Sequence, residues 1–219
     1  MYNLIIKDIL IQKKQVAFSI VYMAFILIAF QGMGEAMLPM GLVALTYMLS
    51  MTSCGYEEKN KSDIMLNSLP VKRANIVAAK YMSVFVYLVM GMIAYALFTK
   101  IIIMIQIPLK TYPITLEAFI GGFAAVSFMT GIWLPIYFKF GYMKLRVVNF
   151  VMFFLFFFGT SYLTKLFKEN QNSQWVQNMI NFLNSQGNIR IALVIAVMVI
   201  IFLIISYGLS VKFYSKREF

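Results

Sequence analysis

Residues 189–209 read IRIALVIAVMVIIFLIISYGL, and this stretch decides the class of the protein. It holds one charged residue, Arg190, close to its beginning. A helix needs about 20 predominantly apolar residues to cross about 30 Å of hydrocarbon, and the stretch meets that requirement. Of the 219 residues in the chain, 62% are hydrophobic and 12% are charged. Soluble domains have about 45–50% apolar and about 25% charged residues, so the sequence predicts an integral membrane protein.

Five windows upstream meet the same criterion for a membrane-crossing helix. Together with the first stretch they give six predicted transmembrane helices, at residues 16–30, 37–54, 76–105, 116–138, 147–163 and 189–209. The window at 76–105 is too long for one straight crossing, which predicts tilt or an extended outer end. No segment between the windows is long enough to bury a core of its own. The sequence therefore predicts an all-α polytopic membrane protein with a single domain over residues 1–219.

A short connection follows the first window, and small residues lie within the window at 116–138. Only residues 31–36 separate the first two windows, which predicts a helical hairpin. Gly121 and Ala125, and then Ser127 and Gly131, have the small-xxx-small spacing that allows close helix contact, within the subunit or across a dimer. Residues expected to interrupt the window at 116–138 are Gly121, Gly122, Gly131 and Pro135.

The basic residues are distributed unevenly between the two predicted sides of the membrane. The cytosolic side retains Lys and Arg, so the side with more of them is the inner one. With the N-terminus inside, the inner side holds Lys7, Lys13, Lys14, Lys59, Lys61, Lys72, Arg73, Lys80, Lys139, Lys144, Arg146, Lys212, Lys216 and Arg217. The outer side holds Lys100, Lys110, Lys165, Lys168 and Arg190. This asymmetry predicts that both termini are cytosolic, with Lys80 and Lys100 extending from within their helices to the headgroups.

The net charge of +11 does not indicate a nucleic-acid partner. The basic residues are not gathered on one face or in one tail, as a phosphate-binding surface requires. The chain has no histidine and one cysteine, Cys54, which excludes an intramolecular disulfide and makes a metal site unexpected. We expect Cys54 to be a small buried apolar residue.

Catalytic and energy-converting motifs are also absent from the sequence. There is no Gly-x-x-x-x-Gly-Lys-Ser/Thr loop for nucleotide binding. No strongly apolar window contains an ionisable pair, which a proton or sodium relay usually needs. The sequence therefore predicts no catalytic residues and no cofactor bound by this chain, and it disfavours an enzyme.

The N-terminal residues 1–15 have the pattern of an amphipathic helix ahead of the first crossing. Helical spacing brings Ile5, Ile9 and Gln12 together, with Ile6 and Leu10 alongside. Lys7, Lys13 and Lys14 can reach lipid headgroups. Two interpretations remain open, an interfacial helix with a mechanical role and a basic flank that sets topology.

The connection at residues 56–73 is dense in charge and then becomes amphipathic. Glu57 and Lys61 are four residues apart in the order that favours an exposed helix. Asn60 is a candidate helix cap, and Pro70 disfavours helix at Leu69. Ile64, Met65, Ser68 and Leu69 fall on one side of two helical turns. The pattern fits either a docking helix for a protein partner or a solvated loop whose apolar residues contact the bilayer.

This connection resembles the first cytosolic loop of ABC-2 type transporter permeases. The residues that carry the resemblance are EEKNKSD at 57–63, LNSLPVKR at 66–73 and IVAAKY at 76–81. The resemblance extends to residues 2–9, to the six-helix plan and to residues 214–219. It is strongest to small Firmicute exporter subunits, including those of the phenol-soluble modulin exporters.

The resemblance implies a permease subunit of an ATP-driven exporter in the bacterial plasma membrane. Two copies of a cytosolic ATPase, which bind the ATP and Mg, would work with two permeases that are identical or related and that meet near their first and fifth helices. The substrate would be amphipathic or hydrophobic, with cytolytic peptides as one candidate. The resemblance assigns Ile5, Ile6, Ile9, Lys13 and Lys14 to an interfacial elbow helix. It assigns the ATPase-coupling helix to Glu57, Glu58, Lys61, Asp63, Ile64, Met65, Ser68 and Leu69.

Two other functions are consistent with the sequence. A membrane anchor or sensor would recruit a cytosolic partner through residues 56–73 and would show no ATP-dependent transport. An ion-coupled secondary transporter would move its substrate along an imposed ion gradient without ATP.

Overall fold

In the computed structural model, residues 2–29, 31–106, 109–169, 173–174, 177 and 188–217 are described. The regular elements in this part of the chain are all helical. They are α1 (Tyr2–Ile11), α2 (Lys13–Ala29), the 3₁₀ helix η1 (Gln31–Ala36), α3 (Met37–Lys59), α4 (Ser62–Ser68), α5 (Arg73–Ile105), α6 (Leu116–Glu169) and α8 (Asn188–Ser215). The predicted all-α class is confirmed.

Four helices are long and apolar enough to cross a membrane. They are Met37–Lys59, Arg73–Ile105, Leu116–Val151 and Arg190–Ser215. The helices α1 and α2 meet the same test together, as a pair bent by 73°, so the described residues hold four or up to five spans. Of the apolar window in α3, 56% is buried inside the molecule, against 6% in α8. The chain is therefore a polytopic membrane protein in which α3 is central and α8 lies on the outside.

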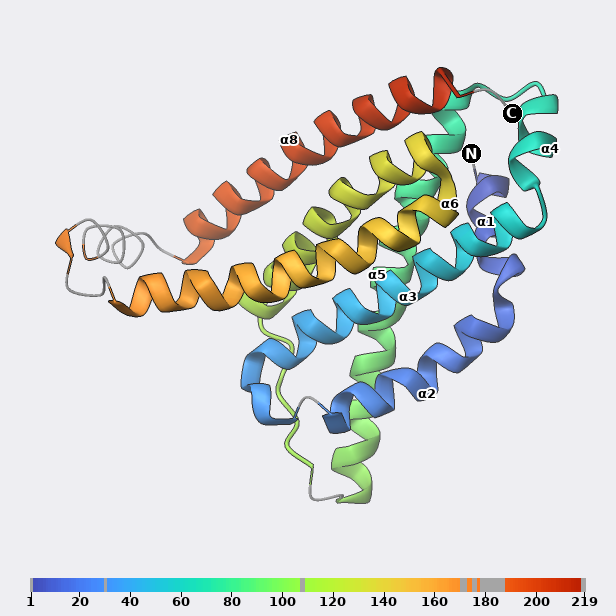
Figure 1. The fold of residues 1–219 in the computed structure, drawn as a ribbon. Helices are drawn as coiled ribbons and strands as arrows, with labels where there is room; N and C mark the ends of the chain where they lie inside the picture. The colour runs from blue at the N-terminus through green and yellow to red at the C-terminus, as the bar shows by residue number, and fades with distance from the viewer. Residues whose placement is uncertain are drawn as a thin grey trace.

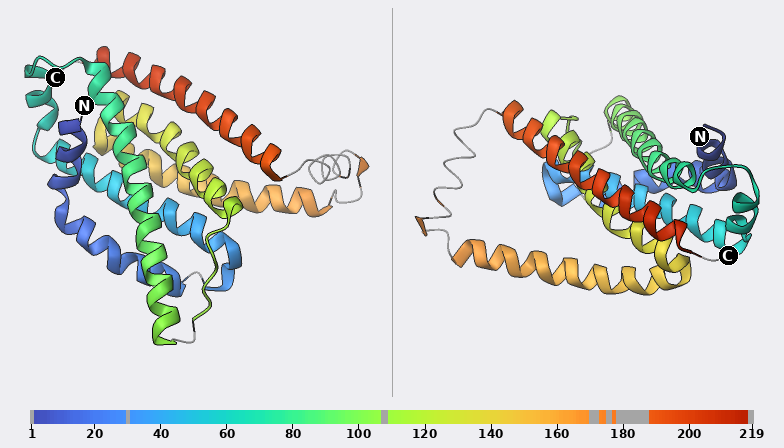
Figure 2. Two further views of the ribbon diagram at one scale, coloured as in Figure 1. Left: turned by 180° about the vertical axis from the view of Figure 1, so that it is seen from behind. Right: turned by 90° about the horizontal axis from the view of Figure 1, so that it is seen from above.

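Both chain ends lie near α4, at one end of the helix bundle (Figure 1). We refer to the region formed by α1, α4, the residues around Gly141 and the last residues of α8 as the α4 end. The helix α3 leads to it and α5 leads away from it, as both views of Figure 2 also show. The segment between α3 and α5 is thus placed beside both termini.

The long helix α6 changes direction at Gly141 (Figure 2). Gly141 has φ 80° and ψ 176°, a backbone conformation that glycine adopts readily because it has no Cβ. The expected interruptions at Gly121, Gly122, Gly131 and Pro135 are not found, since the helix continues through all four. The predicted windows at 116–138 and 147–163 lie on either side of the bend. The side chains of residues 152–165 and 167–169 lie outside the described residues.

Two buried hydrophobic clusters hold the helices together. One joins α2, α3 and α5 through large side chains such as Met23, Leu45 and Tyr87. The other lies at the α4 end, where Leu66 of α4 packs in a cluster with residues of α3, α5, α6 and α8. Its members are Cys54, Leu66, Ile76, Val77, Tyr81, Trp133, Leu134, Tyr137, Phe138, Leu145 and Tyr214. As expected from the sequence, Cys54 is a buried free cysteine.

The small residue Gly131 serves a close contact inside this chain. Ser206 of α8 donates a hydrogen bond to the Gly131 carbonyl oxygen at 2.7 Å. A methyl group added at Gly131 would overlap the ring of Phe202 on α8. The predicted small-xxx-small contact at this position is therefore between α6 and α8 within the subunit.

Candidate functional site

The helix α4 is a short, separate element between α3 and α5. The helix α3 runs through Lys59, so the first residues of the predicted loop belong to it. Asn60 is the C-cap of α3, and Lys61, with φ 50°, precedes α4. The prediction that Asn60 caps the start of the loop helix is therefore wrong. The backbone becomes extended at Leu69, next to Pro70, as the proline predicts.

One face of α4 is anchored and the opposite face is exposed. Leu66 is 2% exposed in the buried cluster, and the Asn67 side-chain amide donates to the Tyr214 hydroxyl at 3.0 Å. Ile64 and Met65 are each 57% exposed, and Leu69 is 46% exposed. Ser68, the fourth residue predicted for this side, is exposed as well. The helix therefore presents large apolar side chains away from the bundle.

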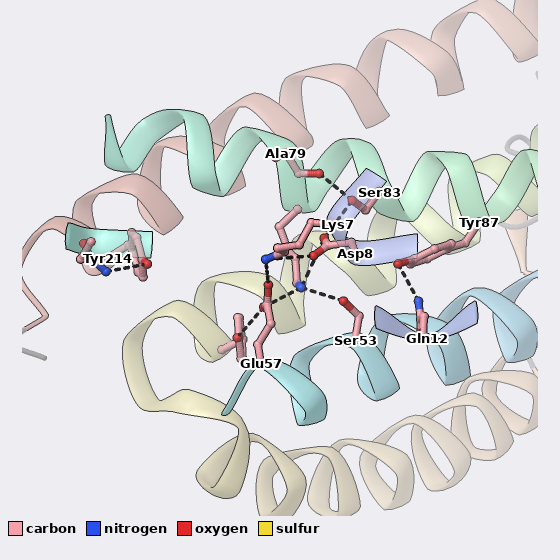
Figure 3. Close-up of polar contacts among 12 residues, drawn as sticks. Lys7, Asp8, Gln12, Ser53, Glu57, Ala79, Ser83, Tyr87 and Tyr214 are labelled. Atoms are coloured by element: carbon pink, nitrogen blue, oxygen red, sulfur yellow. Dashed lines mark hydrogen bonds and ion pairs between the residues drawn. The ribbon is translucent and has the colours of Figure 1, made fainter. Parts of the chain in front are cut away.

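Beside α4, four charged side chains form a cluster in which Asp8, Glu57 and Lys80 are buried and Lys7 is half-buried (Figure 3). The Lys80 ammonium of α5 donates to Glu57 Oε2 at 2.6 Å and to Ser53 Oγ at 2.9 Å, and it lies 3.4 Å from Asp8 Oδ2. Asp8 of α1 also accepts from Ser83 Oγ at 2.9 Å. Asp8, Glu57 and Lys80 are 2%, 5% and 6% exposed.

Lys7 and Tyr137 complete the cluster around Glu57. The Lys7 ammonium donates to Glu57 and lies 3.3 Å from Asp8 Oδ1. The Tyr137 hydroxyl of α6 donates to Glu57 Oε2 at 3.2 Å. Two lysines and two carboxylates thus balance one another, which buried charges require because an unpaired ion in the interior is very costly. The cluster joins α1, α3, α5 and α6.

A buried hydrogen bond extends this connection to the junction of α1 and α2. Gln12 lies between the two helices and its amide donates to the Tyr87 hydroxyl of α5 at 2.6 Å. Of the residues assigned to the elbow helix, Ile5, Ile6 and Ile9 are half-buried. Lys13 and Lys14 are exposed.

The cluster corrects three expectations about charged residues. Lys80 does not extend to the headgroups, since its ammonium is buried between Glu57, Ser53 and Asp8. Lys7 is directed to Glu57 and Asp8 and not to lipid. Glu57 pairs with these lysines and not with Lys61, because α3 ends between them. It is therefore not part of the exposed α4 face, although it was assigned to the coupling helix.

Sequence reasoning missed the cluster because its members are far apart in the chain. Lys80 is 72 positions from Asp8 and 23 from Glu57. The available signal was Lys80 itself, an ionisable residue inside an apolar window, which needs a partner when it is buried. The sequence does not tell which of the nearby carboxylates provides it.

Glu58 links the end of α3 to the bend of α6. Its carboxylate accepts hydrogen bonds from the backbone N–H groups of Tyr142 and Met143, the latter at 3.3 Å. The first N–H groups of a helix have no partner within it, so this carboxylate caps the second part of α6. A methyl group added at Gly141 would lie 3.2 Å from Glu58 Oε2, which shows how closely the bend packs.

Asp63 of α4 and Arg73 of α5 contact the C-terminal residues. Asp63 Oδ2 lies 3.7 Å from the Arg217 guanidinium. Burial and the nearby Glu57 charge raise the pKa of the Asp63 carboxyl, and the Arg217 charge opposes this shift. The Arg73 guanidinium donates to the Ser215 carbonyl oxygen at 2.7 Å. The end of α3 is thus attached to the bend of α6, and α4 and the start of α5 are attached to the end of α8.

The arrangement does not resemble a catalytic or metal site. Within the described residues there is no group of three or more His, Cys, Asp or Glu side chains placed to hold a metal ion. The cavity beside Lys7, Asp8, Glu57 and Lys80 measures about 10 Å³, which is room for one water molecule. The contacts of the cluster fasten α1, α3, α5 and α6 to one another at the α4 end.

Residues 3–215 match the family model described as ABC-2 family transporter protein. The match covers nearly the whole chain, from α1 to the last residue of α8. No curated protein and no solved structure matches the chain significantly.

Proposed function

The chain belongs to the ABC-2 family of transporter proteins, and we propose that it is the permease subunit of an exporter powered by a separate ATPase. The observation that carries this proposal is the exposed apolar face of α4, with Ile64 and Met65 directed away from the bundle. A few large side chains on a short anchored helix suit insertion into a partner's pocket. The ATPase would dock on this face, and its closure would move α4.

The buried cluster provides a route by which such a movement reaches other helices. The helix α4 follows α3 after two residues, and the cluster fastens that end of α3 to α1, α5 and α6. Because a charged cluster of this kind tolerates little separation, the four segments would move together. ATP binding by the partner would then bias the bundle between two packing arrangements.

Topology and assembly are further parts of the proposal. We propose six crossings in a bacterial plasma membrane, with both termini in the cytosol. Both termini lie at the α4 end, which supports their placement on the same side of the membrane. The exposed lysines of that end support the assignment of this side to the cytosol. Two ATPase copies and a second permease, identical or related, complete the transporter. Its substrate would be an amphipathic or hydrophobic compound, with cytolytic peptides as candidates.

The docking proposal is tested by removing the apolar face without changing charge. The Ile64→Ala/Met65→Ala variant should reduce the amount of ATPase that co-purifies from native membranes by about tenfold or more, since each buried large side chain contributes about 1.5–3 kcal/mol. Met143→Ala is the matched control, because Met143 is 71% exposed at the same end of the bundle but not on α4. Equal recovery of ATPase with both variants would show that α4 is not the docking element.

A further inference from the structure

The exposed face of α4 is bordered by lysines. Lys59 is the last residue of α3, Lys61 immediately precedes α4, and Lys72 lies between α4 and α5. All three side chains are exposed. Their ammonium groups make no ion pair with a described residue. The apolar side chains of Ile64, Met65 and Leu69 are therefore flanked by positive charge on both sides.

The described carboxylates of the same region are engaged by other groups of the protein. Asp8 and Glu57 belong to the buried cluster. Glu58 caps the second part of α6, and Asp63 faces Arg217. The sequence of this segment mixes acidic and basic residues, but folding turns the acidic ones inward. Among the described residues, the surface around the α4 face thus carries positive charge without the compensating negative charge that the sequence suggests.

We infer that α4 docks into a cleft of a protein partner that has an apolar floor and an acidic rim. This inference rests on the proposed function and adds the chemistry of the partner surface, with Asp and Glu side chains opposite Lys59, Lys61 and Lys72. Apolar cores with charged rims are usual in protein interfaces. Complementary rim charges speed association and set orientation, while the apolar side chains provide most of the affinity.

A protein cleft fits the geometry better than a lipid surface does. The helix α4 connects the end of α3 to the start of α5 and is not itself part of a membrane-crossing window (Figure 1). Its apolar side chains Ile64 and Met65 are exposed, and the lysines that precede and follow the helix in the chain are exposed as well. A cleft with an acidic rim would cover Ile64 and Met65 and pair with the lysines in one contact, whereas anionic headgroups would pair only with the lysines.

The test removes the charges of the three lysines around α4 and leaves its apolar side chains intact. We compare Lys59→Gln/Lys61→Gln/Lys72→Gln with Lys139→Gln/Lys144→Gln/Lys212→Gln, three exposed lysines of the same end that are not adjacent to α4 in the chain. Binding of the purified ATPase is measured at low and high salt, with the permease in nanodiscs of neutral lipid and, separately, in nanodiscs that contain anionic lipid. We expect the first variant to bind about tenfold more weakly at low salt and to lose most of its salt dependence. The second variant should bind as the wild type does.

Each other outcome has a definite meaning. We call Lys59→Gln/Lys61→Gln/Lys72→Gln the rim variant. If Ile64→Ala/Met65→Ala abolishes binding while the rim variant binds normally at all salt concentrations, α4 docks on the ATPase but the ATPase has no acidic rim opposite the lysines. If neither variant affects binding, both proposals fail. If the rim variant loses binding only in nanodiscs that contain anionic lipid, the lysines bind headgroups and the inference is overturned.

Discussion

At the scale of single residues, the central feature is the pairing of Lys80 with Glu57 and Asp8. The Lys80 ammonium has three oxygen partners and is nearly fully buried. Breaking a buried ion pair on one side leaves an uncompensated charge, whereas replacing both partners removes the penalty. The cluster should therefore tolerate a matched double substitution better than a single one.

We predict that Lys80→Met destabilises the protein by about 3–5 kcal/mol, because Glu57 and Asp8 then share only the charge of Lys7. Lys80→Met/Glu57→Gln should recover part of this loss. Thermal unfolding in detergent gives the comparison. Lys100→Met is the matched control, since Lys100 is an exposed lysine in the same helix. A Lys80→Met protein as stable as this control would refute the structural role of the cluster.

At the scale of elements, close packing between α6 and α8 depends on the missing side chain of Gly131. An added methyl group would displace the Phe202 ring, and the Ser206 hydrogen bond to Gly131 would be strained. Gly208 of α8 has no heavy atom within 4 Å of the position of an added Cβ. Comparing an alanine substitution at Gly131 with one at Gly208 thus separates the effect of packing from the effect of helix propensity.

Gly131→Ala should destabilise the protein by about 1–3 kcal/mol, as overpacking a close contact does. Gly208→Ala should be neutral or slightly stabilising, because alanine is the better helix former. Thermal unfolding of both variants in the same detergent is the measurement. The packing account fails if Gly131→Ala unfolds at the same temperature as Gly208→Ala or at a higher one.

The elements also show which features a sequence can predict. Hydropathy is a local property, so the windows at 37–54, 76–105 and 189–209 lie within α3, α5 and α8. The position of the bend in α6 was missed, because Pro135 is the stronger breaker in general but is accommodated in this helix. At Gly141 the backbone takes a positive φ, and Glu58 and Arg217 lie close to it; the sequence shows neither contact.

The exposed face of α4 was the part of the candidate site that spacing alone could predict. Ile64, Met65, Ser68 and Leu69 lie on one side of two helical turns, and all four are exposed. Spacing does not show that Glu57 points into the protein, because its partners Lys7 and Lys80 are distant in the chain. Long-range pairing of charges is decided by the tertiary structure and not by local periodicity.

At the scale of the whole molecule, the α4 end combines a docking face with a cluster that holds four helices. The helices α1, α3, α5 and α6 meet at this end, and the last residues of α8 are fastened to it by Arg73. In our account, closure of the ATPase moves α4, and these contacts pass the movement to the other helices of the bundle. The account depends on one claim, that an ATPase binds the α4 face.

The most direct measurement of that claim is cross-linking from α4 in native membranes. Cys54 is the only cysteine and is fully buried, so Met65→Cys introduces the reactive thiol on the surface. With a thiol-directed photo-cross-linker, we predict an adduct with an ABC ATPase from position 65 and none from Met143→Cys. Adducts with the ATPase from both positions, or from neither, would contradict the account.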